Sequence, residues 1–328
     1  MAHRPPALVS PQWLHDRLGK VAVLDASWYL DPSRKPKEDY LARRIPTARY
    51  YDLDGIKDYS STLPHMLPSD AAFSAAAEAL GVSRDRPVVV YEREGVFSAP
   101  RAWWTLGAYG HPQAFVLDGG LKAWEGAGFA VEEGPEGAVD PDAGEAAARK
   151  ADEEAGASAG GASAPPYSLD RSRVRTLAQV LERSVNTSLE QVVDARPAVR
   201  WRGEAPETRP GVRSGHIPDS INVPFAAVQE GGRYLDVEAL RTAFEDAGLD
   251  LDELPTRDDA ENPAPGTLDP ALAPPAVVCS CGSGVTACVV LLALQAVAPD
   301  ARLAVYDGSW TEWGGSKDTP VEVGAGEE

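Results

Sequence analysis

Cysteine is scarce in this sequence of 328 residues, which contains only Cys279, Cys281 and Cys288. Cysteines that fall within one short stretch cannot form the disulfide framework that stabilises small secreted proteins. We therefore expect the protein to work in a reducing compartment, either the cytoplasm or the mitochondrion.

Long apolar runs and an excess of basic residues are also missing. No run approaches the roughly 20 apolar residues that a membrane-spanning helix needs, and residues 1–10 do not have the pattern of a signal peptide. The formal net charge is −19, whereas phosphate binding requires basic patches. We therefore expect a soluble protein that has no nucleic-acid or membrane partner.

The chain contains an internal repeat. The segment VAVLDAS, which ends near Asp25, resembles QVVDAR around Asp194, at an offset of 169 residues. Later in the chain, DGGLKAW from Asp118 resembles DGSWTEW from Asp307, and the offset there is 189. Between them, two helix patterns have matching start and stop residues, Ser69 to Gly81 and Asp236 to Gly248. These matches predict two similar domains, with an insertion of about 22 residues in the second.

Each copy alternates short apolar strands with helix-like segments, which is typical of an α/β domain with a mainly parallel sheet and helices on both faces. We expect domains at 1–131 and 167–320, joined by a flexible acidic linker at 132–166. The insertion is expected at about 252–275, which is acidic and rich in proline, and an acidic tail at 321–328. The protein is expected to be a monomer.

One cysteine stands where a strand should turn into a helix. After the apolar segment Ala276–Cys279, the chain runs through CGSGVTA, which begins at Cys281, and enters an apolar helix. Unpaired backbone N–H groups at a helix N-terminus stabilise a thiolate, and Gly282 and Gly284 allow the backbone to curl around the sulfur. The pattern indicates that Cys281 is a nucleophile.

The three cysteines could also serve as core residues, metal ligands or a phosphatase nucleophile. Cys279 and Cys288 lie in a predicted strand and a predicted helix, where a cysteine serves as a small buried hydrophobe. A zinc site would need about four ligands, and no further Cys or His pair has ligand spacing. A cysteine phosphatase would need an arginine at the end of the loop, at the position of Ala287. The sequence therefore favours a nucleophile at Cys281 and core residues at the two flanking positions.

The string VVCSCGSGVTACV, the paired DGG and DGS motifs and the doubled domain together resemble the tandem rhodanese family, in particular its members that act on 3-mercaptopyruvate. The resemblance implies two tandem rhodanese-like domains without a metal or organic cofactor. It also implies transfer of sulfur from 3-mercaptopyruvate to a Cys281 persulfide, with release of pyruvate. The sulfur would then pass to thioredoxin, a small thiol or cyanide. The offset of 189 places Glu92 at the position of Cys281, so the first copy should lack a nucleophile.

Two alternatives to this function remain open, namely a thiosulfate sulfurtransferase and a non-catalytic rhodanese module that docks partners. Relatives specialised for the thiosulfate dianion have basic side chains beside the cysteine, whereas this loop has Gly282 and Ser283. Backbone donors and a hydroxyl group suit a monoanionic keto acid better than a dianion. The retained Cys281 argues against a module without catalytic activity.

The resemblance also implies the site residues. Arg200 and Arg209 occupy the places of the family's two substrate-binding arginines, although each could instead form a surface ion pair with Glu204 or Glu207. The loop would contribute contacts to the substrate from Gly282, Gly284, Val285 and Thr286.

The family is also proposed to use a Ser–His–Asp relay for the thiol proton. Matching residues are Ser283, His65 and Asp54. As an alternative, His65 could cap the turn before Pro68. His216 is assigned to hydrogen bonds that stabilise the fold.

Overall fold

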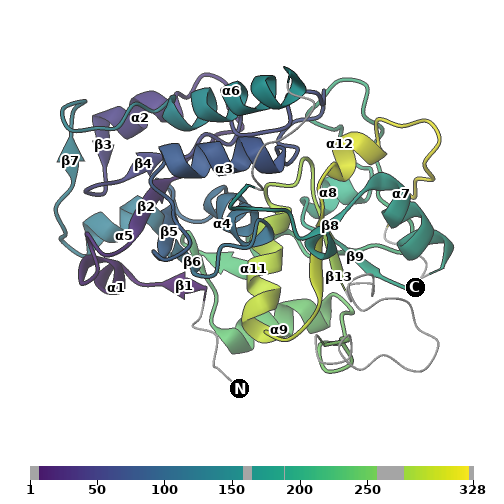
Figure 1. Ribbon diagram of the computed structural model, residues 1–328. Coiled ribbons are helices and arrows are strands. Elements are labelled where there is room, and N and C mark those ends of the chain that lie inside the picture. Colours follow the sequence, from purple (N-terminus) through teal and green to yellow (C-terminus); the bar gives the residue numbers. More distant parts are fainter. Residues whose placement is uncertain (1–6, 158–164, 188, 257–276, 325–328) are drawn as a thin grey trace. The chain divides into compact units, whose positions relative to one another are not determined.

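The computed structural model describes residues 7–157, 165–187, 189–256 and 277–324, and the chain divides into two compact units (Figure 1). Unit 1 comprises Met1–Leu169 and Gly231–Arg233, and unit 2 comprises Asp170–Glu230 and Tyr234–Glu328. In the described part of the chain, no helix is both long enough and apolar enough to cross a membrane.

Unit 1 is built on a parallel sheet with the strand order β1-β6-β5-β2-β4. Two of its three inner strands, β2 and β5, are buried along their whole length, as expected for strands that are covered on both faces. The sheet strands are β1 (Leu8–Val9), β2 (Ala22–Asp25), β4 (Arg49–Tyr50), β5 (Val88–Tyr91) and β6 (Ala114–Leu117). A separate antiparallel pair is formed by β3 (Arg43–Arg44) and β7 (Glu132–Glu133). The helices are α1 (Pro11–His15), α2 (Pro36–Ala42), α3 (Asp70–Ala79), α4 (Ala99–Ala108), α5 (Gly120–Gly126) and α6 (Ala143–Ala157).

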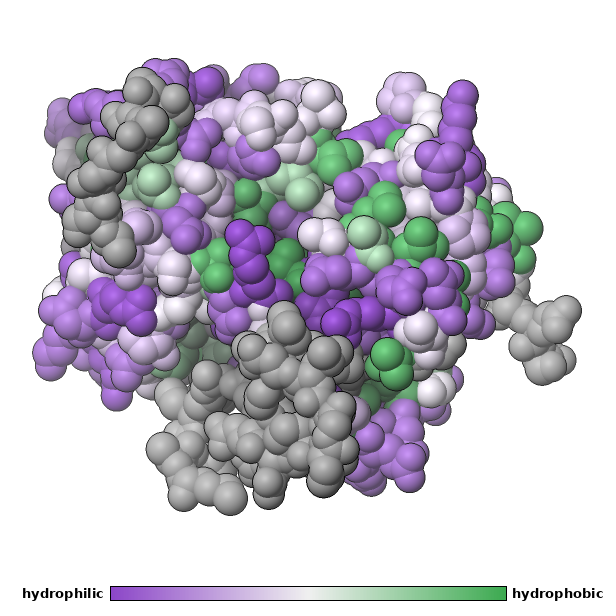
Figure 2. Space-filling model, turned by 45° about the vertical axis from the view of Figure 1, so that its right-hand side comes forward, coloured by the Kyte–Doolittle hydropathy of each residue, from purple (hydrophilic) through white to green (hydrophobic). Residues whose placement is uncertain are grey.

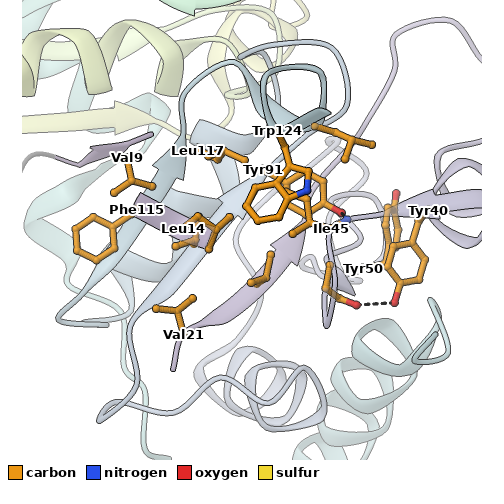
Figure 3. Close-up of a cluster of buried hydrophobic side chains, with 14 residues drawn as sticks. Val9, Leu14, Val21, Tyr40, Ile45, Tyr50, Tyr91, Phe115, Leu117 and Trp124 are labelled. Atoms are coloured by element: carbon orange, nitrogen blue, oxygen red, sulfur yellow. Dashed lines mark hydrogen bonds between the residues drawn. The ribbon is translucent and has the colours of Figure 1, made fainter. Parts of the chain in front are cut away.

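Aromatic side chains fill the core beside this sheet (Figure 3). Trp124, from α5, is fully buried, and its indole N–H donates to the carbonyl of Ala130 at 2.8 Å. The hydroxyl of the buried Tyr40 donates to the carbonyl of Ala48 at 2.9 Å. The polar ends of these large side chains therefore have partners, and the apolar parts are removed from water without an unpaired group.

Unit 2 repeats the parallel sheet, in the order β10-β9-β13-β14-β8. The sheet strands are β8 (Val174–Arg175), β9 (Gln191–Asp194), β10 (Ile221–Asn222), β13 (Val277–Ser280) and β14 (Leu303–Tyr306). A separate pair is formed by β11 (Gln229–Glu230) and β12 (Arg233–Tyr234), and Arg233 of that pair belongs to unit 1. The α-helices are α7 (Leu177–Val180), α8 (Ala198–Trp201), α9 (Val237–Asp246), α11 (Ala287–Val297) and α12 (Ser309–Trp313). Short 3₁₀ and π turns occur at η1 (Arg171–Arg173), η2 (Leu181–Asn186) and η3 (Phe225–Val228).

The helix signals read from the repeat are confirmed. Ser69 and Asp236 are the N-caps of α3 and α9, and each side chain accepts a hydrogen bond from the backbone three residues on. The predicted stop residues Gly81 and Gly248 follow the C-caps and have positive φ values of 65° and 91°. Glycine adopts that conformation without strain, which ends both helices at the same point.

Matching backbone hydrogen bonds confirm the predicted offset of 189 residues. In unit 1 the N–H of Leu121 donates to the carbonyl of Glu92 at 2.8 Å, and in unit 2 the N–H of Trp310 donates to that of Cys281 at 2.9 Å. The loop that begins at Glu92 is therefore the structural counterpart of the loop that begins at Cys281.

The segment expected to be a flexible linker contains the helix α6, which packs on α3 (Figure 1). Small residues allow this packing, because a Cβ atom at Gly144 would lie 3.1 Å from Ile56 and 3.2 Å from Leu80, and Ala148 is fully buried. An alanine-rich segment with acidic residues has the composition of a linker, but alanine is also the best helix former. Composition alone did not distinguish the two.

Two further predicted segments lie partly outside the described residues. The insertion at 252–275 is described only as far as Thr256, and residues 158–164 of the linker are not described. The expected tail begins as part of unit 2, because the backbones of Glu322 and His216 exchange hydrogen bonds of 2.8 and 3.0 Å.

Figure 2 shows mostly hydrophilic residues on the visible face, with hydrophobic residues in small separate patches.

Candidate active site

The nucleophile loop spans residues 281–286, between the end of β13 and the first residue of α11. Gly284 has a φ of 79°, which lets the chain turn back toward the helix, and its counterpart Gly95 in unit 1 has a φ of 115°. The thiol of Cys288, in the first turn of α11, donates to the carbonyl of Gly284 at 3.3 Å. The loop thus lies where the sequence predicted it.

The N-terminal end of α12 supports this loop. The backbone N–H groups of Trp310 and Thr311 donate to the carbonyls of Cys281 and Gly282, both at 2.9 Å. The N–H of Cys281 in turn donates to the hydroxyl of Ser309 at 3.3 Å. The segment that begins with the DGS motif therefore holds the two residues at the start of the loop in position.

The three cysteines have different surroundings. Cys279, at the end of β13, is fully buried, and burial raises the pKa of its thiol well above the ordinary value. Cys288 is fully buried in α11. These placements confirm that Cys279 and Cys288 are core residues. Cys281 is also buried, at 2% exposed, but stands on the loop rather than in a regular element.

Both predicted substrate-binding arginines lie beside the loop. Arg200 is in α8, and its Nη2 would lie 3.6 Å from a Cβ atom placed on Gly282. Arg209 donates through Nη1 to the hydroxyl of Thr311 at 3.3 Å. Unit 2 therefore brings two guanidinium groups to the surroundings of Gly282, next to Cys281, which is where a substrate carboxylate would need them.

A chain of alternating charges holds Arg200 in place. Arg196, 1% exposed, forms a bidentate pair with Asp194 and also contacts Glu207 at 2.8 Å. The other oxygen of Glu207 accepts a hydrogen bond from Arg200. The ion pair that the sequence offered as an alternative to substrate binding is thus present, but Glu207 is only 4% exposed, so the pair is not a surface feature.

One atom of Arg200 has no partner in the described part of the chain. Its Nε is buried and makes no hydrogen bond. Buried donors are nearly always satisfied in folded proteins, so an orphan donor on this side chain is an exception.

His65 and Asp54 form a pair within unit 1. Nε2 of His65 lies 2.9 Å from Oδ1 of Asp54, and the indole N–H of Trp28 donates to Oδ2 at 2.8 Å. Desolvation acts to raise the pKa of Asp54, but the hydrogen bonds from His65 and Trp28 outweigh it and hold that pKa below the ordinary value. Ser283, 7% exposed, belongs to unit 2. The relay that would join all three stays a prediction.

Val285 and Thr286 complete the loop. Thr286 is the N-cap of α11, and the carbonyl of Val285 accepts the N–H of Cys288 at 3.1 Å. The role of these residues in substrate binding stays a prediction. His216 is 1% exposed, and its Nδ1 lies 2.8 Å from the carbonyl of Trp201, which confirms that it stabilises the fold.

In unit 1 the loop surrounds the carboxylate of Glu92 with backbone donors. Its carboxylate accepts hydrogen bonds from the backbone N–H groups of Phe97, Ser98 and Ala99, the last two at 2.8 and 3.0 Å. Burial raises the pKa of Glu92 to about 7, although the backbone donors act to lower it. The first copy therefore directs N–H groups at an acidic side chain where the second copy has Cys281.

Sequence reasoning missed Glu207, Ser309 and Thr311 as members of the site. Glu207 was considered only as a competitor for the arginines, and the DGS motif only as a marker of the repeat. The recurrence of that motif in both copies is the signal that could have found Ser309 and Thr311. A motif that is kept in both copies indicates that its residues contact another part of the domain.

No group of three or more His, Cys, Asp or Glu side chains that could hold a metal ion occurs among the residues that the structure describes. The model of the rhodanese-like domain matches the chain twice, at residues 10–127 and 176–316.

Relatives of known identity match nearly the whole chain. The Thiosulfate/3-mercaptopyruvate sulfurtransferase 1 of Arabidopsis thaliana is 36% identical over 322 residues, which are 96% of this chain and 78% of the relative. The 3-mercaptopyruvate sulfurtransferase of Escherichia coli is 34% identical over 323 residues, which are 96% of this chain and 97% of the relative. The crystal structure of the Escherichia coli 3-mercaptopyruvate sulfotransferase matches with a TM-score of 0.71 and 30% identity, and the match covers 93% of this chain and 99% of that chain.

Proposed function

Because the chain belongs to the rhodanese family, we propose that it transfers sulfur from 3-mercaptopyruvate through a persulfide on Cys281 and releases pyruvate. The observation that carries this proposal is the match to 3-mercaptopyruvate sulfurtransferases along both domains, over 96% of the chain. The chain is a sulfurtransferase with two rhodanese domains, and its second domain retains a cysteine on the loop between β13 and α11.

The substrate carboxylate is the group that Arg200 and Arg209 bind. A guanidinium group can donate two parallel hydrogen bonds to a carboxylate, which orients the substrate as well as attracting it. Both side chains lie near Gly282, so a keto acid held there places its thiol sulfur toward Cys281. The unpartnered Nε of Arg200 is a donor available to the carboxylate once the side chain shifts.

In the first half-reaction the Cys281 thiolate attacks the sulfur of the substrate, and a sulfur–sulfur bond forms while the carbon–sulfur bond breaks. The electron pair of the broken bond leaves as the enolate of pyruvate, which takes up a proton at carbon. Backbone N–H groups of the loop stabilise the negative charge. Ser283, His65 and Asp54 are the residues through which the thiol proton would leave.

In the second half-reaction an acceptor thiolate or cyanide attacks the outer sulfur of the persulfide. Cys281 leaves as a thiolate and is ready for another cycle. Thioredoxin and small thiols are the acceptors that we propose. We also propose a monomer that works in the cytoplasm or the mitochondrion.

Thiosulfate is the second candidate donor, because the Arabidopsis relative carries both donors in its name. The test is to measure kcat/KM for both donors side by side, with cyanide as the common acceptor. We expect 3-mercaptopyruvate to be favoured by at least about tenfold, the size of one misplaced charge contact. Equal efficiencies, or a preference for thiosulfate, would overturn the choice of donor and leave the persulfide mechanism in place.

A further inference from the structure

Thr311, in α12, contacts both the nucleophile loop and a substrate-binding arginine. Its hydroxyl lies 2.5 Å from the carbonyl oxygen of Gly282, and its backbone N–H donates to the same oxygen at 2.9 Å. Nη1 of Arg209 lies 3.3 Å from the hydroxyl oxygen. One side chain therefore joins the residue after Cys281 to Arg209.

The chemistry of the three groups determines the direction of each hydrogen bond. A carbonyl oxygen can only accept, and a guanidinium group can only donate. The single hydroxyl proton of Thr311 must therefore point to Gly282, and a lone pair on its oxygen accepts from Arg209. The hydroxyl can therefore form both hydrogen bonds at the same time.

The partner that holds Arg209 is neutral, whereas the partner that holds Arg200 is charged. Arg200 is held by the ion pair with the buried Glu207. For Arg209, the hydroxyl of Thr311 is the only hydrogen-bond partner within the described ranges, and no carboxylate of those ranges pairs with it. A long side chain loses about 2 kcal/mol of rotamer entropy when it is ordered, so a partner that orders it beforehand reduces the cost of binding substrate.

The first copy indicates that the fold does not need the hydroxyl. Lys122 is the counterpart of Thr311, and its backbone N–H donates to the carbonyl of Arg93 at 3.2 Å. At this position the loop of unit 1 forms without a hydroxyl contact, since lysine has no hydroxyl group. The hydroxyl contact is thus added in the copy that carries the nucleophile.

We propose that Thr311 is a positioning residue for sulfur transfer, which holds Arg209 at a set place relative to Gly282 so that the substrate carboxylate is bound with its sulfur beside Cys281. This inference rests on the proposed function, because it takes the ligand of Arg209 to be the carboxylate of the keto acid.

The experiment is a double-mutant cycle between Thr311 and Arg209 in the full chain. Thr311→Val removes the hydroxyl and keeps the branched shape, and we expect it to raise KM for 3-mercaptopyruvate about tenfold with kcat changed less than about threefold. Thr311→Ser retains the hydroxyl and should recover most of the loss. Thr242→Val is the matched control, because among the described residues that exposed threonine bonds only to the carbonyl of Glu238 in its own helix.

The cycle separates positioning from general damage to the fold. In the Arg209→Ala background, Thr311→Val should change KM by less than about twofold, since its partner is already gone. If the two effects multiply, Thr311 acts independently of Arg209 and the inference is wrong, while the proposed function stands. If Arg209→Ala alone leaves KM unchanged, the carboxylate is bound elsewhere, and both the inference and that part of the proposed function are overturned.

Discussion

Replacing Glu92 with glutamine tests how the first copy accommodates an acidic group at the position of the nucleophile. The carboxyl is 5% exposed, and burial raises its pKa from 4.5 to about 7 against the pull of three backbone donors. A difference of that size corresponds to roughly 3 kcal/mol between the two protonation states. Because the pKa is higher in the folded state than in the unfolded chain, the contribution is full below about pH 4.5 and is lost as the pH rises to about 7.

Glutamine imitates the protonated form. Its oxygen can accept the three backbone N–H groups, and its amide can donate to the hydroxyl of Ser98, which itself lies 2.8 Å from the carbonyl of Ala26. We therefore expect Glu92→Gln to match the wild type near pH 5 and to be more stable by about 1–3 kcal/mol at pH 8, as measured by urea unfolding.

Glu94, on the same loop as Glu92, provides the control for this prediction. Glu94 is 66% exposed, and its hydrogen bond with Arg34 lowers its pKa, so Glu94→Gln should bring no gain in stability at pH 8. If Glu92→Gln proves less stable than the wild type at pH 8, the backbone donors outweigh the cost of burial. The reasoning about this carboxyl would then be wrong.

Two further predictions concern the substrate. Arg200→Ala or Arg209→Ala should each lower kcat/KM for 3-mercaptopyruvate by about tenfold to a hundredfold, since a charge-assisted contact is worth about 1.5–3 kcal/mol, and lysine should restore only part. Steady-state kinetics would check this, and unchanged values for both variants would exclude them from the site. Replacing Gly282 with Arg and Ser283 with Lys should move the ratio of donor efficiencies toward thiosulfate, because the added positive charge favours a dianion. An unchanged ratio in the two-donor assay would count against that electrostatic effect.

The architecture could be predicted from the sequence because the chain contains two copies of the same domain, which can be compared with each other. Each signal was weak alone, but the caps at Ser69 and Asp236 and the offset between Glu92 and Cys281 agreed with one another. The helix α6 could not be separated from a linker, because its packing on α3 depends on tertiary contacts that composition does not record.

The site was predictable only in part for a related reason. A motif locates Cys281 and its loop because the turn requires glycine at Gly284, where φ is positive. The contacts of Glu207 and Thr311 connect residues that are distant along the chain or differ between the two copies, so no local sequence pattern predicts these contacts. Such supporting residues become visible only when the geometry is known.

Intact-mass measurement after brief exposure to 3-mercaptopyruvate tests the central claim most directly, when combined with quantification of released pyruvate. We predict one added sulfur, about 32 Da, per wild-type chain together with pyruvate release. The variants Cys279→Ser and Cys288→Ala should behave in the same way, since both residues lie in the core. Cys281→Ser should gain no sulfur and release no pyruvate. Sulfur carried by the Cys281→Ser chain, or pyruvate released by that variant at the wild-type rate, would contradict the account.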